Sequence, residues 1–235
     1  MGPGNTAVLE HGIREVAARF NMDWKISYRT QKKRVAVLVS KMDHCLYDLL
    51  IRHEAGELEC EIPVIVSNWE HLAPVAAKFG VPFRYLPLNG KDPASKAAQE
   101  AKLEELLEEL RIDVMVLARY MQIFSPEFAS KHWRRTINVH HSFLPAFEGA
   151  RPYHRAHDRG VKIIGATAHY ASAELDAGPI IDQGVTRVSH RDSVADMVRK
   201  GRDLERLVLS RALRWHLEDR IVVNGNKNKT IVFED

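Results

Sequence analysis

Short apolar runs rich in β-branched residues alternate with helical patterns from Arg34 onward, and this alternation constrains the fold more than any other feature of the sequence. It is typical of βαβ units, in which each strand is followed by a helix that packs on a mostly parallel sheet. The first four predicted strands are brief and almost wholly apolar, as strands covered on both faces are. They are RVAVLVS at 34–40, EIPVIVS at 61–67, residues 82–87 and DVMVLA at 113–118. The sequence therefore predicts an α/β fold with a mostly parallel central sheet and flanking helices.

The pattern changes after Arg135, where three predicted strands precede one long helix. The strands are TINVHHS at 136–142, KIIGATAHYA at 162–171 and GPIIDQGVTRV at 178–188, and the helix covers about 192–217. RIVVNG and KTIVFE then flank Asn-Lys-Asn-Lys and predict a closing hairpin. The clearest helix lies earlier, at about 94–110, because its leucines recur at i, i+3, i+4 and i+7 and form one apolar stripe. These leucines are Leu103, Leu106, Leu107 and Leu110.

The segment ahead of Arg34 has a pattern of its own. Ile13, Val16, Ala17 and Phe20 have helical spacing, whereas Trp24, Ile26 and Tyr28 alternate as in a half-buried strand. One helix and one strand are too little to make a domain. We therefore expect residues 1–33 to be an appendage with a polar linker, and residues 34–235 to be the catalytic domain.

Composition excludes several classes of protein. The 235 residues are 45% hydrophobic and 28% charged, which is ordinary for a globular protein. Lys and Arg number 34 against 31 Asp and Glu, an excess of +3 that is too small and too evenly spread for a nucleic-acid surface. The two cysteines give no disulfide framework, and no segment is long and apolar enough for a membrane helix or a secretory signal. We expect a cytoplasmic protein with no nucleic-acid or membrane partner, present as a homo-oligomer.

The strongest chemical signal is the predicted strand that contains Asn138 and His140. Successive side chains of a strand point to opposite faces, so Asn138 and His140 share one face and His141 is expected on the other. An amide can donate to an oxyanion, and an imidazole can move a proton near neutral pH. Asp176 precedes a turn and could orient His140 or accept a proton from water. Taken alone, all three residues could equally be polar groups satisfied by strand ends and turns.

A metal site is the main alternative use of the histidines. Six of them lie between His132 and His169, but the sequence has no HExxH motif and no Cys/His cluster with zinc spacing. We therefore predict no catalytic metal, and ordinary helix and loop contacts for His154 and His157. Cys45 has no neighbouring groups that would activate a nucleophile, so we predict a buried apolar role for it.

Together these motifs resemble those of the formyltetrahydrofolate deformylases. Asn-x-His is followed by Ser-x-Leu-Pro at 142–145 and later by Asp-x-Gly at 176–178, and the run HHSFLPAFEGARPYHRAHDRGVKIIGATAHY is similar to this branch specifically. The resemblance covers about 200 residues, from Arg34 onward. It implies a Rossmann-like formyltransferase fold and hydrolysis of 10-formyltetrahydrofolate, a step connected with one-carbon metabolism and purine biosynthesis. It also implies that Asn138, His140 and Asp176 are catalytic.

The resemblance further implies a folate pocket and no separate cofactor, since the folate is the substrate. The pocket residues it implies are Arg119, Tyr120, Met121, Gln122, Ile123, Phe124, His141, Ser172, Ala173 and Glu174. From the residues alone, core packing is an alternative role for the apolar members of the loop at 117–126. The segment at 9–30 resembles the last helix and strand of an ACT regulatory domain.

The acceptor of the formyl group distinguishes the remaining functions. Glycinamide ribonucleotide formyltransferases carry a Gly-rich phosphate loop after the first strand, whereas residues 39–45 of this chain contain no glycine. Water is therefore the expected acceptor. The alternatives are a formyl transferase to an amine and a catalytically idle folate-binding protein. Formate release from 10-formyltetrahydrofolate without any amine would separate the hydrolase from both.

Overall fold

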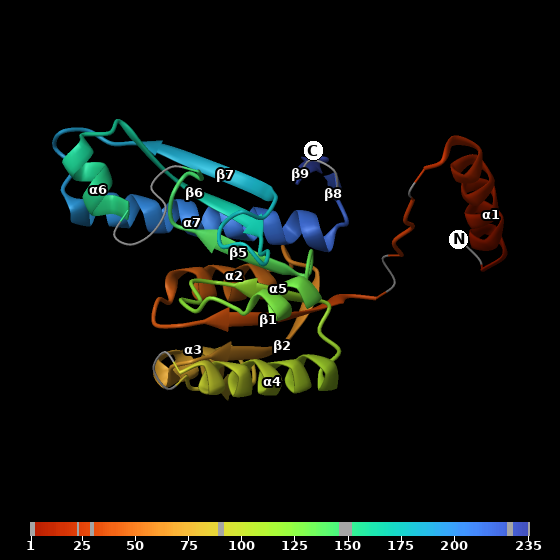
Figure 1. The fold of residues 1–235 in the computed structure, drawn as a ribbon, viewed down its shortest axis with the longest axis horizontal. Coiled ribbons are helices and arrows are strands. Elements are labelled where there is room, and N and C mark those ends of the chain that lie inside the picture. The colour runs from red at the N-terminus through yellow and green to blue at the C-terminus, as the bar shows by residue number, and fades with distance from the viewer. Residues whose placement is uncertain are drawn as a thin grey trace. The chain divides into compact units, whose positions relative to one another are not determined.

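The sheet that the alternating pattern predicts forms within residues 33–235, which are one of two compact units of the chain; the other is residues 1–32. Figure 1 shows the unit at residues 33–235 as a sheet with helices along both faces. The computed structural model describes residues 3–22, 24–28, 31–88, 92–145, 152–224 and 228–234. None of the helices in these ranges is long and apolar enough to cross a lipid bilayer.

The first unit contains the predicted helix but not the predicted strand. Helix α1 covers Pro3–Phe20, whereas the described residues 24–28 have no strand conformation, so that prediction is wrong. A strand needs a neighbour to complete its backbone hydrogen bonds, and the described residues of this unit supply only a helix. Instead, the Tyr28 hydroxyl donates to the Glu10 carboxylate on α1. The ACT-like interpretation of this segment stays a prediction.

Seven strands form the main sheet of the described residues, in the order β3-β2-β1-β4-β5-β6-β7. They are β1 (Lys33–Val39), β2 (Cys60–Ser67), β3 (Phe83–Tyr85), β4 (Val114–Leu117), β5 (Thr136–His140), β6 (Ile163–Tyr170) and β7 (Ile180–Arg187). The neighbours from β3 to β5 are parallel, whereas β6 is antiparallel to both β5 and β7. The prediction of a mostly parallel sheet is confirmed.

Helices cover both faces of this sheet. They are α2 (His44–Glu54), the short 3-10 helix η1 (Glu70–Leu72), α3 (Ala73–Lys78), α4 (Pro93–Glu109), α5 (Pro126–Lys131), α6 (Pro152–Arg159) and α7 (Val194–Leu217). Alternate residues of β1 divide between the two layers: Val35 and Val37 pack in the core with α2 and α7, and Ala36 and Leu38 pack with α4. This division explains why the strand is apolar throughout.

Local sequence signals fix the ends of the long helices. Asp92 accepts hydrogen bonds from the backbone at Ala94 and Ser95, which starts α4 at Pro93. Ser193 and Asp196 form a capping box that starts α7. The predicted hairpin is confirmed as β8 (Ile221–Asn224) paired antiparallel with β9 (Lys229–Val232), although residues 225–227 of its turn lie outside the described residues.

Candidate active site

A pocket of about 470 Å³ lies at the carboxyl ends of β4 and β5, where α/β folds place ligands. Three segments line it: the end of β4 with the following loop and Ala129 of α5, the end of β5, and the end of β6 with the loop to β7. The lining residues are Leu117, Arg119, Tyr120, Met121, Gln122, Ile123, Phe124, Ala129, Asn138, Val139, His140, His141, His169, Ala171, Ser172, Ala173, Leu175 and Asp176. This set is called the main pocket below.

The structure brings together in this pocket nearly all the site residues that the sequence predicts. The exception is Glu174, which does not line the pocket. Its backbone carbonyl accepts a hydrogen bond from the Ser172 hydroxyl within the loop, so Glu174 contributes to the shape of the loop rather than to the pocket wall.

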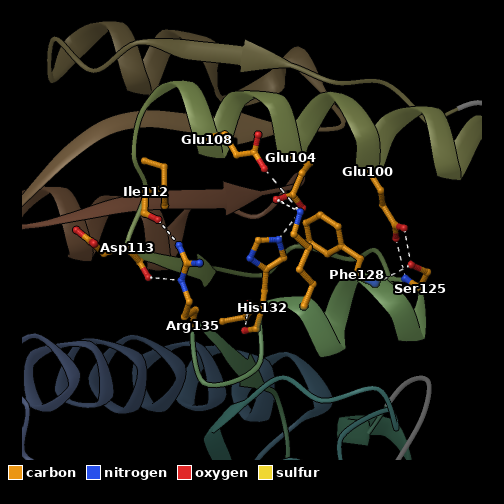
Figure 2. Close-up of polar contacts among 11 residues, drawn as sticks. Glu100, Glu104, Glu108, Ile112, Asp113, Ser125, Phe128, His132 and Arg135 are labelled. Carbon is orange, nitrogen blue, oxygen red and sulfur yellow. Dashed lines mark hydrogen bonds and ion pairs between the residues drawn. The ribbon is translucent and has the colours of Figure 1, made fainter. Parts of the chain in front are cut away.

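Contacts at its two ends fix the loop between β4 and α5. At the start, the backbone N–H of Met121 donates to Ser40 Oγ at 3.0 Å, and the Ser40 hydroxyl donates to Asn68 Oδ1 at 2.7 Å. At the end, Glu100 of α4 accepts from both the backbone N–H and the hydroxyl of Ser125, at 2.7 and 2.6 Å (Figure 2). The loop that forms one wall of the pocket is therefore tied to the residues that follow β1 and β2, and to α4.

His132 has a structural role next to this loop. Its ring packs against Phe128 with centroids 4.5 Å apart and the ring planes tilted by 43°, and its Nε2 lies 2.8 Å from Glu104 Oε2 (Figure 2). Arg135 donates to the backbone carbonyls of Ile112 and Asp113, which joins β5 to the start of β4. The six histidines therefore do not form one site. His132 links α5 to α4 and does not line the pocket, whereas His140, His141 and His169 do.

Asn138, His140 and Asp176 meet in the pocket. His140 Nδ1 lies 3.2 Å from Asp176 Oδ2, with the His140 side chain 8% exposed and that of Asp176 13% exposed. His140 Nε2 is buried and has no hydrogen-bond partner within the described part of the chain. The contact with Asp176 directs the ring so that Nδ1 faces the carboxylate, which leaves Nε2 as the atom available for proton transfer.

His169 is a fourth member of this centre, and the sequence analysis missed it. β5 and β6 pair so that Asn138 lies opposite His169, and Asn138 Nδ2 is 3.1 Å from His169 Nε2. His169 Nδ1 lies 3.0 Å from the Tyr170 carbonyl oxygen, which can only accept, so Nδ1 carries a proton. In the neutral ring Nε2 then accepts from Asn138. Strand alternation did not reveal His169, because finding it requires the pairing of β5 with β6.

The Asp176 carboxylate is held ionised. Burial acts to raise its pKa, but the contacts with His140 and His169 outweigh burial and hold the pKa of Asp176 well below its usual range. The His169 Nε2 contact with Asp176 Oδ1 is 3.6 Å, beyond hydrogen-bond distance. His140 is therefore the principal partner of Asp176, and His169 that of Asn138.

The sharp turn after β6 depends on Gly178. A Cβ at this position would lie 1.7 Å from the Tyr170 carbonyl oxygen and 3.4 Å from His169 Nδ1. Two residues earlier, Asp176 adopts a left-handed φ of 56°. In the Asp-x-Gly motif the backbone at Gly178 therefore packs closely against that of Tyr170, and this close approach places Asp176 next to His140 at the end of β5.

Strand alternation predicts that His141 points away from the site, and this prediction is wrong. β5 ends at His140, so the alternation does not extend to His141. Its ring packs edge-on against His140 with centroids 5.1 Å apart, and it lines the main pocket. Burial, together with the positive charge of Arg119, lowers the pKa of His141 to about 4, so the ring is neutral at physiological pH.

A second buried group of polar residues lies beside Arg119, and the sequence analysis did not find it. His44 Nε2 is 2.7 Å from Glu205 Oε2, the Tyr153 hydroxyl donates to Glu205 Oε1 at 3.0 Å, and Arg119 Nε is 3.4 Å from Glu205 Oε2. These four residues are called the Glu205 cluster below. Their spacing in the sequence exceeds 30 residues, so no local motif marks them.

His44 and Glu205 of this cluster, together with Cys45, form the one combination of possible metal ligands found among the described residues. Ligand atoms of His44, Cys45 and Glu205 lie within 4.8 Å of one another. The Glu205 carboxylate is already paired with Arg119 and His44, and burial raises the pKa of the Cys45 thiol, which keeps it protonated. A protonated thiol is a poor metal ligand, so the contacts present fit an internal ion-pair network better than a cation site.

Comparisons with known proteins point to one family. A family described as "Formyl transferase" matches residues 33–213. Formyltetrahydrofolate deformylases from Synechocystis sp. and Bacillus subtilis are 54% and 50% identical, covering 93% and 96% of this chain and 75% and 73% of theirs. The crystal structure of a formyltetrahydrofolate deformylase from Pseudomonas syringae pv. tomato superimposes with a TM-score of 0.90 at 48% identity, covering 97% of this chain and 75% of that one.

The close approach at Gly178 gives a first testable prediction. In Gly178→Ala the new Cβ must displace the Tyr170 carbonyl, which moves His169 and Asp176. A displacement of about 1 Å at a reacting group can cost about 100-fold in rate, so we expect a loss of that order in turnover, measured alongside thermal unfolding. Gly12→Ala is the control, because its Cβ meets nothing within 4 Å. Normal turnover in Gly178→Ala would show that the close approach does not position Asp176.

Proposed function

The chain belongs to the formyltetrahydrofolate deformylase family, and we propose that the main pocket holds 10-formyltetrahydrofolate with its formyl group against Asn138 and His140. The enzyme hydrolyses this folate to formate and tetrahydrofolate. The observation that best supports the proposed site is the buried His140–Asp176 contact of 3.2 Å beside the unpaired Nε2 of His140.

The reaction needs proton transfers that His140 can supply. Asp176 accepts from Nδ1–H, so neutral His140 has its lone pair on Nε2. Water attacks the formyl carbon and gives a proton to this Nε2. The protonated ring, stabilised by the Asp176 carboxylate, then gives that proton to N10 as the C–N bond breaks. The products are tetrahydrofolate with N10–H and formic acid, which ionises to formate.

Asp176 is the orienting group in this scheme. The contacts that hold its pKa below the usual range make the carboxylate a weak base, so it is poorly suited to take a proton directly from water. Its charge instead stabilises the positive charge that develops on the ring during proton transfer and keeps Nδ1 as the donor. Of the two roles that the sequence leaves open for Asp176, we therefore propose the orientation of His140.

Asn138 is suited to stabilise the oxyanion. One Nδ2 hydrogen is directed to His169 Nε2 at 3.1 Å, which leaves the second for the formyl oxygen as negative charge develops there. The proton on His169 Nδ1, held by the Tyr170 carbonyl, fixes this orientation of the amide. A donor that is already oriented needs no reorganisation during the reaction.

The proposed function is tested by incubating the pure protein with 10-formyltetrahydrofolate alone and following formate. We expect formate release without an added amine. Asn138→Ala and His140→Ala should each lower turnover by about 100- to 1,000-fold, the usual cost of one oxyanion donor, and Asp176→Asn should cause a loss of similar order. Folate binding should change little in all three.

His154→Ala is the matched control for this series, because His154 is exposed on α6, and its turnover should be normal. Formate release that requires an added amine would contradict hydrolysis. Near-normal turnover in Asp176→Asn would contradict the proposed orientation of His140.

We also propose that the reaction needs no metal or other cofactor, since His140, Asn138 and Asp176 together supply the proton transfers and the oxyanion donor. Exhaustive chelation should leave formate release unchanged. Loss of activity with EDTA, followed by recovery with zinc or iron, would contradict this proposal and point to the His44, Cys45 and Glu205 group as the metal site.

We also propose that the enzyme is a cytoplasmic homo-oligomer without nucleic-acid or membrane partners. Exposed apolar side chains of the hairpin and its C-terminal extension, Val222, Ile231 and Phe233, support association. Cys45 and Cys60 are buried and form no disulfide, which suits a reducing compartment. Equilibrium sedimentation tests the assembly, and a single monomeric species would overturn it. Cell fractionation tests the location.

A further inference from the structure

Arg119 occupies a backbone conformation that glycine would adopt without strain. Its φ is 63°, in the left-handed region, two residues after β4 ends at Leu117. Non-glycine residues in this region are uncommon and cluster at functional sites; of those in the described residues, Arg119 and Asp176 line the main pocket. Arg119 lines the same pocket as Asn138 and His140, so its side chain has a position from which it can act on the substrate.

Glu205 is the acidic partner of this arginine, through an ion pair in which Arg119 Nε makes no hydrogen bond. Its side chain is 2% exposed, and its Oε2 lies 3.4 Å from Arg119 Nε and 2.7 Å from His44 Nε2. Burial acts to raise the pKa of Glu205, but the His44 hydrogen bond and the Arg119 charge outweigh it and lower that pKa. Glu205 is therefore a buried carboxylate whose basic neighbours are His44 and Arg119.

A glycine on α7 leaves space for the hydrogen bond between Tyr153 and this carboxylate. Gly201 lies one helical turn before Glu205 on α7, and a Cβ there would be 1.9 Å from the Tyr153 hydroxyl oxygen. Tyr153 can therefore reach Glu205 Oε1 only because residue 201 is glycine. α2, α6 and α7 thus converge on a single carboxylate beside the main pocket.

We propose that Glu205 is a positioning residue for the deformylase reaction: its carboxylate holds the Arg119 guanidinium in the pocket wall, where the positive charge stabilises the developing oxyanion and binds the product formate. The proposal rests on the proposed function of the same pocket. Arg119 is always charged and can bind a carboxylate through two parallel N–H groups, so formate matches it chemically. A guanidinium in a poorly solvated pocket also acts more strongly on charge than it would in water.

Glu205→Gln and Arg119→Gln test this role. Glu205→Gln keeps the size of the side chain but removes the charge that holds Arg119, so turnover should fall by about 100-fold, as expected for a displaced group. Arg119→Gln should lower turnover to a similar extent. In both variants product inhibition by formate should weaken about tenfold or more, the usual worth of a hydrogen bond to a charged group.

The double variant Glu205→Gln/Arg119→Gln separates positioning from structural support. A single Glu205→Gln change leaves Arg119 with an uncompensated charge and lowers stability, whereas removing both charges should restore much of it. If Glu205 acts through Arg119, turnover of the double variant stays as low as that of either single variant. Recovery of both stability and turnover would overturn the proposal, because it would show that the pair is only structural.

Asp182→Asn is the matched control, since Asp182 and Arg211 form a half-buried ion pair that also involves α7, with Nε–Oδ2 at 2.8 Å. It lines no part of the main pocket, so stability should fall while turnover and formate inhibition stay normal. Wild-type protein that releases no formate would overturn the proposed function itself. Formate release by the wild type, with unchanged formate inhibition in Arg119→Gln, would overturn only the role of Arg119 and Glu205.

Discussion

β5 lies between the parallel and antiparallel parts of the sheet, and this position determines the geometry of the reaction centre. On one side it continues the parallel order of β4, so its carboxyl end meets the loop that begins at Arg119. On the other side it pairs antiparallel with β6, with Asn138 opposite His169 and Ile137 opposite Tyr170, so β6 ends beside the start of β5. The loop after β6 then brings Asp176 back to His140, with Nδ1 and Oδ2 3.2 Å apart. The antiparallel register therefore places His169 beside Asn138, and the loop that follows completes the centre with Asp176.

Electrostatic pairing explains how two carboxylates stay ionised in this poorly solvated region. Asp176 faces His140, and Glu205 faces Arg119 and His44. In each case the partner lowers the pKa of the carboxyl although burial acts in the opposite direction. A buried charge without a partner would neutralise or destabilise the fold. The two carboxylates can thus serve different purposes, since one orients an imidazole that transfers protons and the other orients a guanidinium that keeps its charge.

Most of the fold could be predicted from the sequence because its signals are local. Unbroken apolar runs identify strands covered on both faces, and the leucine stripe that includes Leu103 and Leu107 identifies α4. The residues that sequence reasoning missed depend on contacts between distant segments. His169 becomes visible only through its register with Asn138, and Glu205 only where α7 meets the loop after β4. The strand predicted at 24–28 is wrong for the same reason, since alternation of side chains does not supply the neighbouring strand that a ladder requires.

The segment after β1 bears on the choice between water and an amine as formyl acceptor. A phosphate-bearing acceptor needs backbone N–H groups that it can approach closely, which glycine provides. Here that segment leads into α2 without a glycine, and its residue His44 is turned inward to the Glu205 carboxylate, with its side chain 8% exposed. His44, at the position where an acceptor phosphate would need to approach, instead contacts the Glu205 carboxylate that pairs with Arg119. The absence of glycine after β1 and the inward position of His44 both favour water as the nucleophile.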